Sequence, residues 1–122
     1  MSTDEPANQP LSVQHCVPCE GGTPPLDADD IAALLPRVPA WSLRRGEGGD
    51  ELVRELRFSD FLEAKHFVDR LTPIAESEGH HPDLELGWGR VVVHLRTHAA
   101  DGLTPNDFIL AAKVDEMLGR PE

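Results

Sequence analysis

Three histidines in the second half of the sequence could exchange protons at one site if the fold brings them together. His80 and His81 are adjacent and are followed by the rigid Pro82, and His98 comes later in the chain. Histidine is the side chain whose unperturbed pKa, about 6.5, allows it to give and take protons near neutral pH. The sequence places no serine or cysteine as an obvious nucleophile beside them and contains no glycine-rich phosphate loop. These residues therefore indicate proton transfer without a covalent intermediate.

Two acidic residues could assist these histidines, although each also has a purely structural interpretation. Glu76 falls in the last turn of a predicted helix, where it could be an ordinary exposed acid. Asp107 falls at the third position of another helix, where a carboxylate often closes a cap. His94 has the same strand parity as His98, but four residues along a strand span roughly 13 Å, so the two cannot share one metal ion if the strand forms.

Length and charge restrict the class of protein. The chain has 122 residues, enough for one domain with a single core and a spare tail. Its formal net charge of −11 argues against a sequence-independent grip on nucleic acid phosphates, which needs clustered Lys and Arg. No run approaches the roughly 20 apolar residues of a membrane helix, and the N-terminus has no signal-peptide pattern. We therefore expect a cytoplasmic protein that binds neither nucleic acid nor membrane.

The first 25 residues differ in composition from the rest and predict an extended or mobile arm. The first 30 residues contain no Lys or Arg, and five prolines fall between Pro6 and Pro25. Such a segment cannot bury much apolar surface, so we expect it to lack an anchor in the core. Within it, Cys16 and Cys19 form a C-x-x-C pair that could hold a soft metal. A structural zinc site needs four ligands, usually two such pairs, and the sequence has no second pair.

The predicted domain, residues 26–122, begins with a short helix that Asp27 can cap. Trp41 and Leu43 then alternate with polar neighbours, as the residues of a half-buried strand do. A glycine-rich turn leads to a second strand, which covers residues 52–58.

A long helix is predicted next, with Ser59 as its cap. Pro73 lies inside the pattern and predicts a kink or a break. Gly79 suits the left-handed residue that ends a helix, so the helix delivers the chain directly to the histidine pair. The apolar positions recur at steps of three and four residues: Phe61, Ala64, Phe67, Val68, Leu71, Ile74 and Ala75.

Two further strands follow the histidine pair. Residues 84–88 alternate between apolar and other side chains, and residues 91–97 are rich in β-branched types. Antiparallel pairing across a tight turn would return Thr97 and His98 to the level of His80.

A last helix completes the predicted domain. Thr104 can cap it, and Pro105 takes its first position. The order α-β-β-α-β-β-α describes an α+β domain in which a four-stranded antiparallel sheet carries helices on one face.

The sequence resembles the pterin-4a-carbinolamine dehydratases in a set of residues that includes the three histidines. The set has the family's spacing: Glu76-x-x-x-His80-His81-Pro82, followed by Trp88, His98 and Asp107. The resemblance runs from about Cys16 to Leu118, because the Cys-Val-Pro-Cys stretch and its following glycines resemble the start of many bacterial members.

The resemblance implies a fold and a reaction. The fold is a four-stranded antiparallel sheet with helices on one side, assembled into dimers or tetramers. The reaction is dehydration of a 4a-hydroxytetrahydropterin to the quinonoid dihydropterin in tetrahydrobiopterin recycling, with no metal or organic cofactor. Aromatic amino acid hydroxylases leave this carbinolamine behind, so such an enzyme is the implied pathway partner.

The resemblance also implies roles for individual residues. His80 and His98 would be the acid–base pair and His81 would mainly hold the substrate, so these three are the predicted catalytic residues. Glu76 and Asp107 would orient or charge-balance the imidazoles. Trp88 completes the supporting set. The predicted substrate contacts are His80, His81, Pro82, Thr97, His98 and Ala99.

Two other interpretations stay open at the level of sequence. Vertebrate relatives also act as dimerisation cofactors for a transcription factor, so the chain could be a non-catalytic interaction module or coactivator. The intact set of histidines argues against a vestigial site. A small metal protein that uses Cys16, Cys19 and histidines would instead contain stoichiometric zinc.

Overall fold

The computed structural model describes residues 9–19 and 21–119 and has the predicted α+β architecture. Short 3-10 helices precede or join the main elements: η2 (Leu11–Val13), η3 (Leu35–Arg37) and η4 (His98–Ala100). Within the described ranges, no helix is long and apolar enough to cross a membrane. The main elements follow the predicted order: α1 (Ala28–Leu34), β1 (Ser42–Gly46), β2 (Gly49–Arg57), α2 (Phe61–Glu78), β3 (Asp83–Gly87), β4 (Arg90–Leu95) and α3 (Pro105–Met117).

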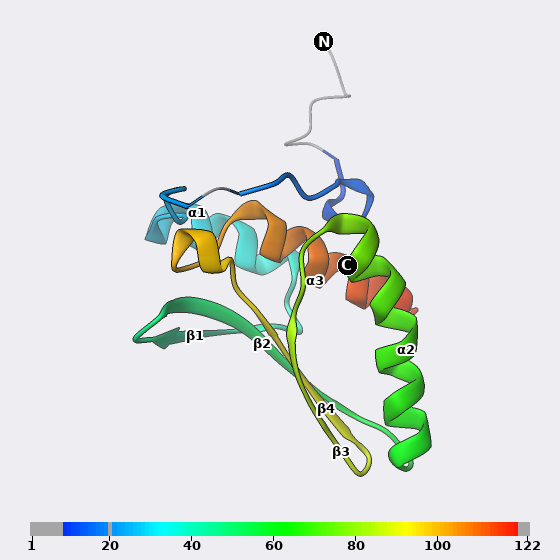
Figure 1. Cartoon of the computed structure of the whole chain (residues 1–122). Coiled ribbons are helices and arrows are strands. Elements are labelled where there is room, and N and C mark those ends of the chain that lie inside the picture. The colour runs from blue at the N-terminus through cyan, green and yellow to red at the C-terminus, as the bar shows by residue number, and fades with distance from the viewer. Residues whose placement is uncertain (1–8, 20, 120–122) are drawn as a thin grey trace.

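The four strands form one antiparallel sheet in the order β1-β2-β4-β3, so pairing of β2 with β4 joins the two hairpins. The helices lie on one face of this sheet, and α2 runs alongside the β3–β4 hairpin (Figure 1). The opposite face carries charged side chains and His94, which bonds Glu51 and Glu85. The covered face carries buried apolar side chains: Leu52, Leu56, Val91, Val93 and Leu95.

One charged pair lies on the covered face. Arg54, which has the same strand parity as Leu52 and Leu56, is 7% exposed and forms an ion pair with Asp115 of α3. The indole of Trp41 donates a hydrogen bond to the same carboxylate at 2.9 Å. This pair joins α3 to β2, and removing one partner would leave a buried charge uncompensated.

Helix α2 begins one residue later than predicted and continues through its proline. Asp60, not Ser59, is the N-cap, because its carboxylate accepts a hydrogen bond from a backbone amide of the first turn. The helix is continuous through Pro73, so the predicted break does not occur. Buried residues on both sides of the proline hold the helix through tertiary packing, which outweighs one lost hydrogen bond. Gly79 ends the helix as predicted, with a left-handed φ of 63°.

The arm is anchored to the domain through residues 9–19, which we call the docked segment. Leu11 is 4% exposed and belongs to the hydrophobic core, so the expectation that the arm lacks an apolar anchor is wrong. The docked segment lies across α3 and near the C-terminal end of α2 (Figure 1). The composition of the segment did not predict this anchor, because a single leucine among prolines and polar residues changes the average composition little. The boundary between an arm over residues 1–25 and a domain over residues 26–122 stays a prediction.

Candidate active site

His80 and Asp107 form a buried pair where the end of α2 meets the start of α3. His80 follows Gly79, and Asp107 is the third residue of α3. The Nε2 atom of His80 lies 2.6 Å from Oδ1 of Asp107. The side chain of His80 is 11% exposed and that of Asp107 is 0% exposed, so water competes little for this hydrogen bond.

The second oxygen of Asp107 is held by two threonines. Oδ2 accepts hydrogen bonds from the hydroxyl of Thr97 at 2.8 Å and from the amide of Thr104 at 3.0 Å. The two threonine hydroxyls lie 2.8 Å apart. Because Thr97 donates its one hydroxyl hydrogen to Asp107, Thr104 must be the donor between them. Asp107 is therefore a helix-capping carboxylate and the partner of His80 at once.

This network fixes which nitrogen of His80 can exchange a proton. A carboxylate only accepts hydrogen bonds, so Nε2 carries the hydrogen that is donated to ionised Asp107. The Nδ1 atom of His80 is then the one that can take up or release a proton. A partner of this kind holds both the tautomer and the orientation of the imidazole ring.

The other two predicted histidines have carboxylate partners near the surface. The Nε2 atom of His81 lies 2.5 Å from Glu76 Oε2, and both side chains are more than half exposed. The Nε2 atom of His98 lies 3.6 Å from Asp83 Oδ2, beyond hydrogen-bond distance, and these side chains are 68% and 69% exposed. Little packing holds either imidazole, and only that of His81 has its carboxylate within hydrogen-bond distance.

A closed turn places His98 at the edge of the site. β4 ends two residues before Thr97, so the predicted strand over residues 91–97 is too long at its end. The amide of Thr97 donates to the carbonyl of Gly102 at 2.8 Å and closes a turn that contains η4. The tip of the first hairpin lies directly behind this turn, since a Cβ at Gly49 would come within 1.9 Å of the Asp101 carbonyl oxygen.

The three histidines line one cavity of about 240 Å³. The pairing of β3 with β4 returns the chain to the level of the histidine pair, as predicted. Pro82 instead lines a neighbouring hollow of about 150 Å³ together with Glu76, and His81 lies between the two spaces. The predicted site residues that line the cavity are His80, His81, Thr97, His98 and Ala99.

Other lining residues were not predicted as part of the site. Three of them adjoin predicted residues in the sequence, so neighbourhood along the chain was the available signal: Gly79, Arg96 and Asn106. The remaining three come from the docked segment: Val17, Pro18 and Cys19. These lie far from the histidines in the sequence, and no residue pattern indicated that they reach the cavity.

Trp88 lies away from this cavity. It follows β3 at the turn of the β3–β4 hairpin, and the histidines lie at the other end of that hairpin. Its side chain is 74% exposed. A single chain therefore does not bring Trp88 into the pocket in the predicted supporting position.

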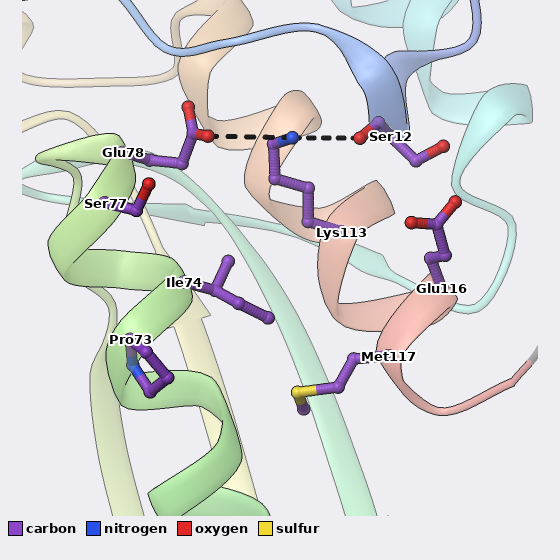
Figure 2. A pocket seen from close by; sticks show the side chains of 8 residues that line it. All are labelled: Ser12, Pro73, Ile74, Ser77, Glu78, Lys113, Glu116 and Met117. Carbon is purple, nitrogen blue, oxygen red and sulfur yellow. Dashed lines mark hydrogen bonds and ion pairs between the residues drawn. The ribbon is translucent and has the colours of Figure 1, made fainter.

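A larger hollow of about 440 Å³ lies between η2, α2 and α3, and no histidine lines it (Figure 2). Its polar groups hold the docked segment. The ammonium of Lys113 donates to the carbonyl of Ser12 at 2.9 Å and lies 3.6 Å from Glu78. Glu78 accepts from the amide of Cys16 at 2.7 Å and bonds His15 at 2.9 Å. The candidate active site is thus the smaller cavity, which the three histidines line.

Burial, hydrogen bonds and charges around the docked segment shift two pKa values. Burial acts to raise the pKa of Glu78, but the hydrogen bonds from Cys16 and His15 and the charge of Lys113 hold it below its usual value. Burial, and next the charges of Glu78 and Asp107, raise the pKa of the Cys16 thiol to about 12.

The described residues 9–19 and 21–119 contain no group of three or more His, Cys, Asp or Glu side chains that could hold a metal ion.

Comparisons of sequence find similar proteins over most of the chain. The profile of the family described as pterin 4 alpha carbinolamine dehydratase matches residues 24–117. A protein of Methylococcus capsulatus named "Putative pterin-4-alpha-carbinolamine dehydratase" is 46% identical over 107 residues, which cover 88% of this chain and 92% of that protein. A protein of Halorhodospira halophila with the same name is 45% identical over 107 residues, with 88% and 96% covered.

Comparisons of structure find the same fold. A transcriptional coactivator/pterin dehydratase from Brucella melitensis has a TM-score of 0.68 and 28% identity, covering 76% of this chain and 97% of its own. A pterin dehydratase-like protein identified as a RuBisCO assembly factor in the alpha-carboxysome has a TM-score of 0.56 and covers 66% of this chain and 92% of its own. At 23% identity, the second similarity concerns the fold alone.

Proposed function

Because the chain belongs to the pterin 4 alpha carbinolamine dehydratase family, we propose that it is a hydro-lyase that converts 4a-hydroxytetrahydropterin to quinonoid dihydropterin and water. One observation carries the proposal: His80, His81 and His98 meet in one cavity, and His80 is bonded to the buried Asp107. The reaction needs an acid and a base within reach of the same small molecule. Imidazoles can supply both near neutral pH.

The reaction breaks the C4a–O bond of the pterin and makes a C=N bond in its ring. The hydroxyl oxygen on C4a takes up a proton and leaves as water. The ring nitrogen next to C4a loses its proton, and its electron pair forms the new double bond. One proton enters and one leaves, so the step is neither an oxidation nor a reduction.

His80 suits the role of the base. Its Nε2 hydrogen is donated to Asp107, so Nδ1 is free to accept the proton of the ring nitrogen. The imidazolium that forms is stabilised by the adjacent buried carboxylate, as in other histidine–carboxylate pairs.

His98 suits the role of the acid. It lies in the same cavity and is mostly exposed, so solvent can restore its proton after each turnover. His81, which lies between the cavity and the neighbouring hollow, would hold the substrate with its ring oriented by Glu76.

One assay tests this function. An aromatic amino acid hydroxylase generates the carbinolamine, and its ultraviolet decay is followed with and without the protein. We expect faster decay with the wild-type protein and the uncatalysed rate with a variant that combines His80→Ala and His98→Ala. Equal decay with and without wild-type protein contradicts the proposal, and full activity of the double variant contradicts the histidine mechanism.

A second candidate function is an interaction module, because a similar structure is named as a transcriptional coactivator as well as a pterin dehydratase. A module of this kind would bind a partner protein and leave the decay of the carbinolamine unchanged. The same assay therefore separates the two functions. The retained His80–Asp107 pair favours the enzyme.

We also propose that the chain acts in the cytoplasm as a homodimer or homotetramer, on a carbinolamine supplied by an aromatic amino acid hydroxylase. β1 and β3 are the edge strands of the sheet, and open edges invite pairing with another chain. A single 13.4 kDa species in sedimentation at micromolar concentration contradicts the assembly. The connection between β2 and α2 is hydrogen-bonded to the β3–β4 turn. Near this point, large apolar side chains are exposed and can form a contact between two copies of the chain: Phe61, Leu62, Leu86 and Trp88.

A further inference from the structure

The docked segment supplies part of the lining of the histidine cavity. Val17, Pro18 and Cys19 line this cavity, although they lie far from the three histidines in the sequence. Val17 is 66% exposed, although the backbone that carries it is held on both sides. An apolar side chain that is fixed in place but left uncovered beside a cavity is available to a ligand.

Asn106 holds this part of the segment by its backbone. Its Oδ1 atom accepts from the amide of Val17 at 2.9 Å, and its Nδ2 donates to the Val17 carbonyl at 2.6 Å. Nδ2 also lies 3.5 Å from the sulfur of Cys19. Asn106 is 4% exposed, so these contacts are shielded from water. The Asn106 side chain therefore pairs with both the amide and the carbonyl of Val17, as the backbone of an adjacent β-strand would.

Glu78 holds the adjoining residue from the other helix. Its Oε1 atom accepts from the amide of Cys16 at 2.7 Å, and its side chain is 6% exposed. Lys113 lies near the same carboxylate and donates to the carbonyl of Ser12, as Figure 2 shows. The segment is therefore attached to both α2 and α3.

The two attachment residues adjoin the two members of the buried pair. Asn106 directly precedes Asp107, and Glu78 is separated from His80 by one glycine. The position of the segment is therefore tied to the same two helix ends that position the pair. Val17, Pro18 and Cys19 therefore line the same cavity as His80.

We propose that Val17, Pro18 and Cys19 form a substrate-contacting wall of the histidine cavity, which determines how tightly the pterin binds. The inference rests on the proposed dehydratase function. The histidines and Arg96 supply polar groups, whereas this wall supplies apolar surface against which the flat pterin ring system or its substituent can pack. The wall contributes binding energy and takes no part in proton transfer.

Thiol protection tests the contact directly. The high pKa of Cys16 keeps its thiol protonated and slow to react, so Cys19 is the thiol that an aromatic disulfide reagent labels first. Saturating 7,8-dihydrobiopterin should slow this labelling about tenfold, and a Cys19→Ser control should remove the rapid phase. If 7,8-dihydrobiopterin leaves the labelling rate unchanged in a preparation that accelerates carbinolamine decay, the proposed wall is contradicted and the dehydratase function is not. A wild-type protein without that activity overturns the dehydratase function, and the wall with it.

A pair of charge substitutions tests the contribution to binding. Val17→Asp places a carboxylate in the wall, and Val13→Asp places one on the same segment at a position that is likewise exposed and does not line the histidine cavity. Val17→Asp should raise KM for the carbinolamine about fivefold and leave kcat nearly unchanged, because the wall binds ground state and transition state alike. Val13→Asp should change neither constant. Equal effects of the two substitutions, or a fall in kcat without a rise in KM, overturn the proposal.

Discussion

His80 and His98 line the same cavity, but their surroundings hold them in different ways. His80 is nearly buried and donates to a carboxylate whose other oxygen is occupied by Thr97 and Thr104. His98 is mostly exposed, and its nearest carboxylate, that of Asp83, lies at ion-pair distance without a hydrogen bond.

The difference distinguishes a preorganised part of the candidate site from a part that is open to a bound molecule. On the His80 side, tautomer, ring orientation and partner are fixed before anything binds. On the His98 side, the imidazole is positioned by its turn but its ring is free to rotate. The two imidazoles should therefore depend on their carboxylates to very different degrees.

The strongest test removes the fixed side. His80→Ala should lower kcat by about 10², the effect of losing a positioned proton-transfer group. Asp107→Asn should cost a similar factor, because the amide can donate to His80 and so favours the wrong tautomer. If the two act as a unit, the double variant is no slower than His80→Ala alone. Additive losses in steady-state kinetics would show that Asp107 acts independently.

The exposed side should show a sharp contrast between the histidine and its carboxylate. His98→Ala should also lower kcat by about 10², since an acid is lost. Asp83→Asn should change kcat by less than about threefold, because an exposed pair without a hydrogen bond contributes little. A loss of tenfold or more in Asp83→Asn would mean that His98 is held as firmly as His80.

His81 should lie between these limits. His81→Ala should raise KM about tenfold and lower kcat less, as expected for a group that binds the substrate without exchanging its protons. Glu76→Gln keeps an acceptor for the ring and serves as the matched control, with a smaller rise in KM. A larger effect on kcat than on KM would move His81 into the proton-transfer step.

His94 tests whether pairing with carboxylates is sufficient for a role in catalysis. It bonds Glu51 and Glu85 on the uncovered face of the sheet, outside the cavity. His94→Gln should therefore leave kcat and KM unchanged. A loss of turnover would show that the uncovered face of the sheet contributes to the site.

The same variant should reveal a dependence of stability on pH. Burial acts to lower the pKa of His94, but the hydrogen bonds and charges of Glu85 and Glu51 raise it above its usual value. A raised folded-state pKa stabilises the protein below the unfolded pKa of about 6.5, and this stabilisation is lost as pH rises through the folded value. His94→Gln should thus melt about 2 °C below wild type at pH 5.5, with the gap closing by pH 8.5. A gap that is constant with pH would exclude this titration.

The sequence predicted the elements that have a regular period and the residues that lie close along the chain. The pairing of the last two strands followed from the β-branched run of β4, and Thr104 and Asp107 had the spacing of a cap. Asp107 had two interpretations, and its two oxygens have separate partners: Oδ2 accepts from the amide of Thr104 in the cap, and Oδ1 bonds His80. Its role in orienting the imidazole stays a prediction.

The misses share a physical cause, which is contact between distant parts of the chain. Leu11 anchors a segment whose composition predicts no anchor, and Asn106 bonds a backbone that carries no periodic signal. Trp88 was given a supporting role by resemblance; the register of the hairpin places it at the opposite end from the histidines, and its role stays a prediction. Composition and periodicity report local structure, and neither reports which residues meet after folding.

The docking of residues 9–19 also determines when the pocket can form during protein synthesis. Cys16 bonds a residue 62 positions later, and Val17 bonds one 89 positions later. This segment is made before the residues that hold it, so it cannot dock until synthesis has passed Asn106. Contacts of such long range close large loops and form slowly. A nascent chain that already carries His80 and His81 thus lacks one wall of its cavity until α3 emerges, and a chain released before that point would have the histidines without a complete pocket.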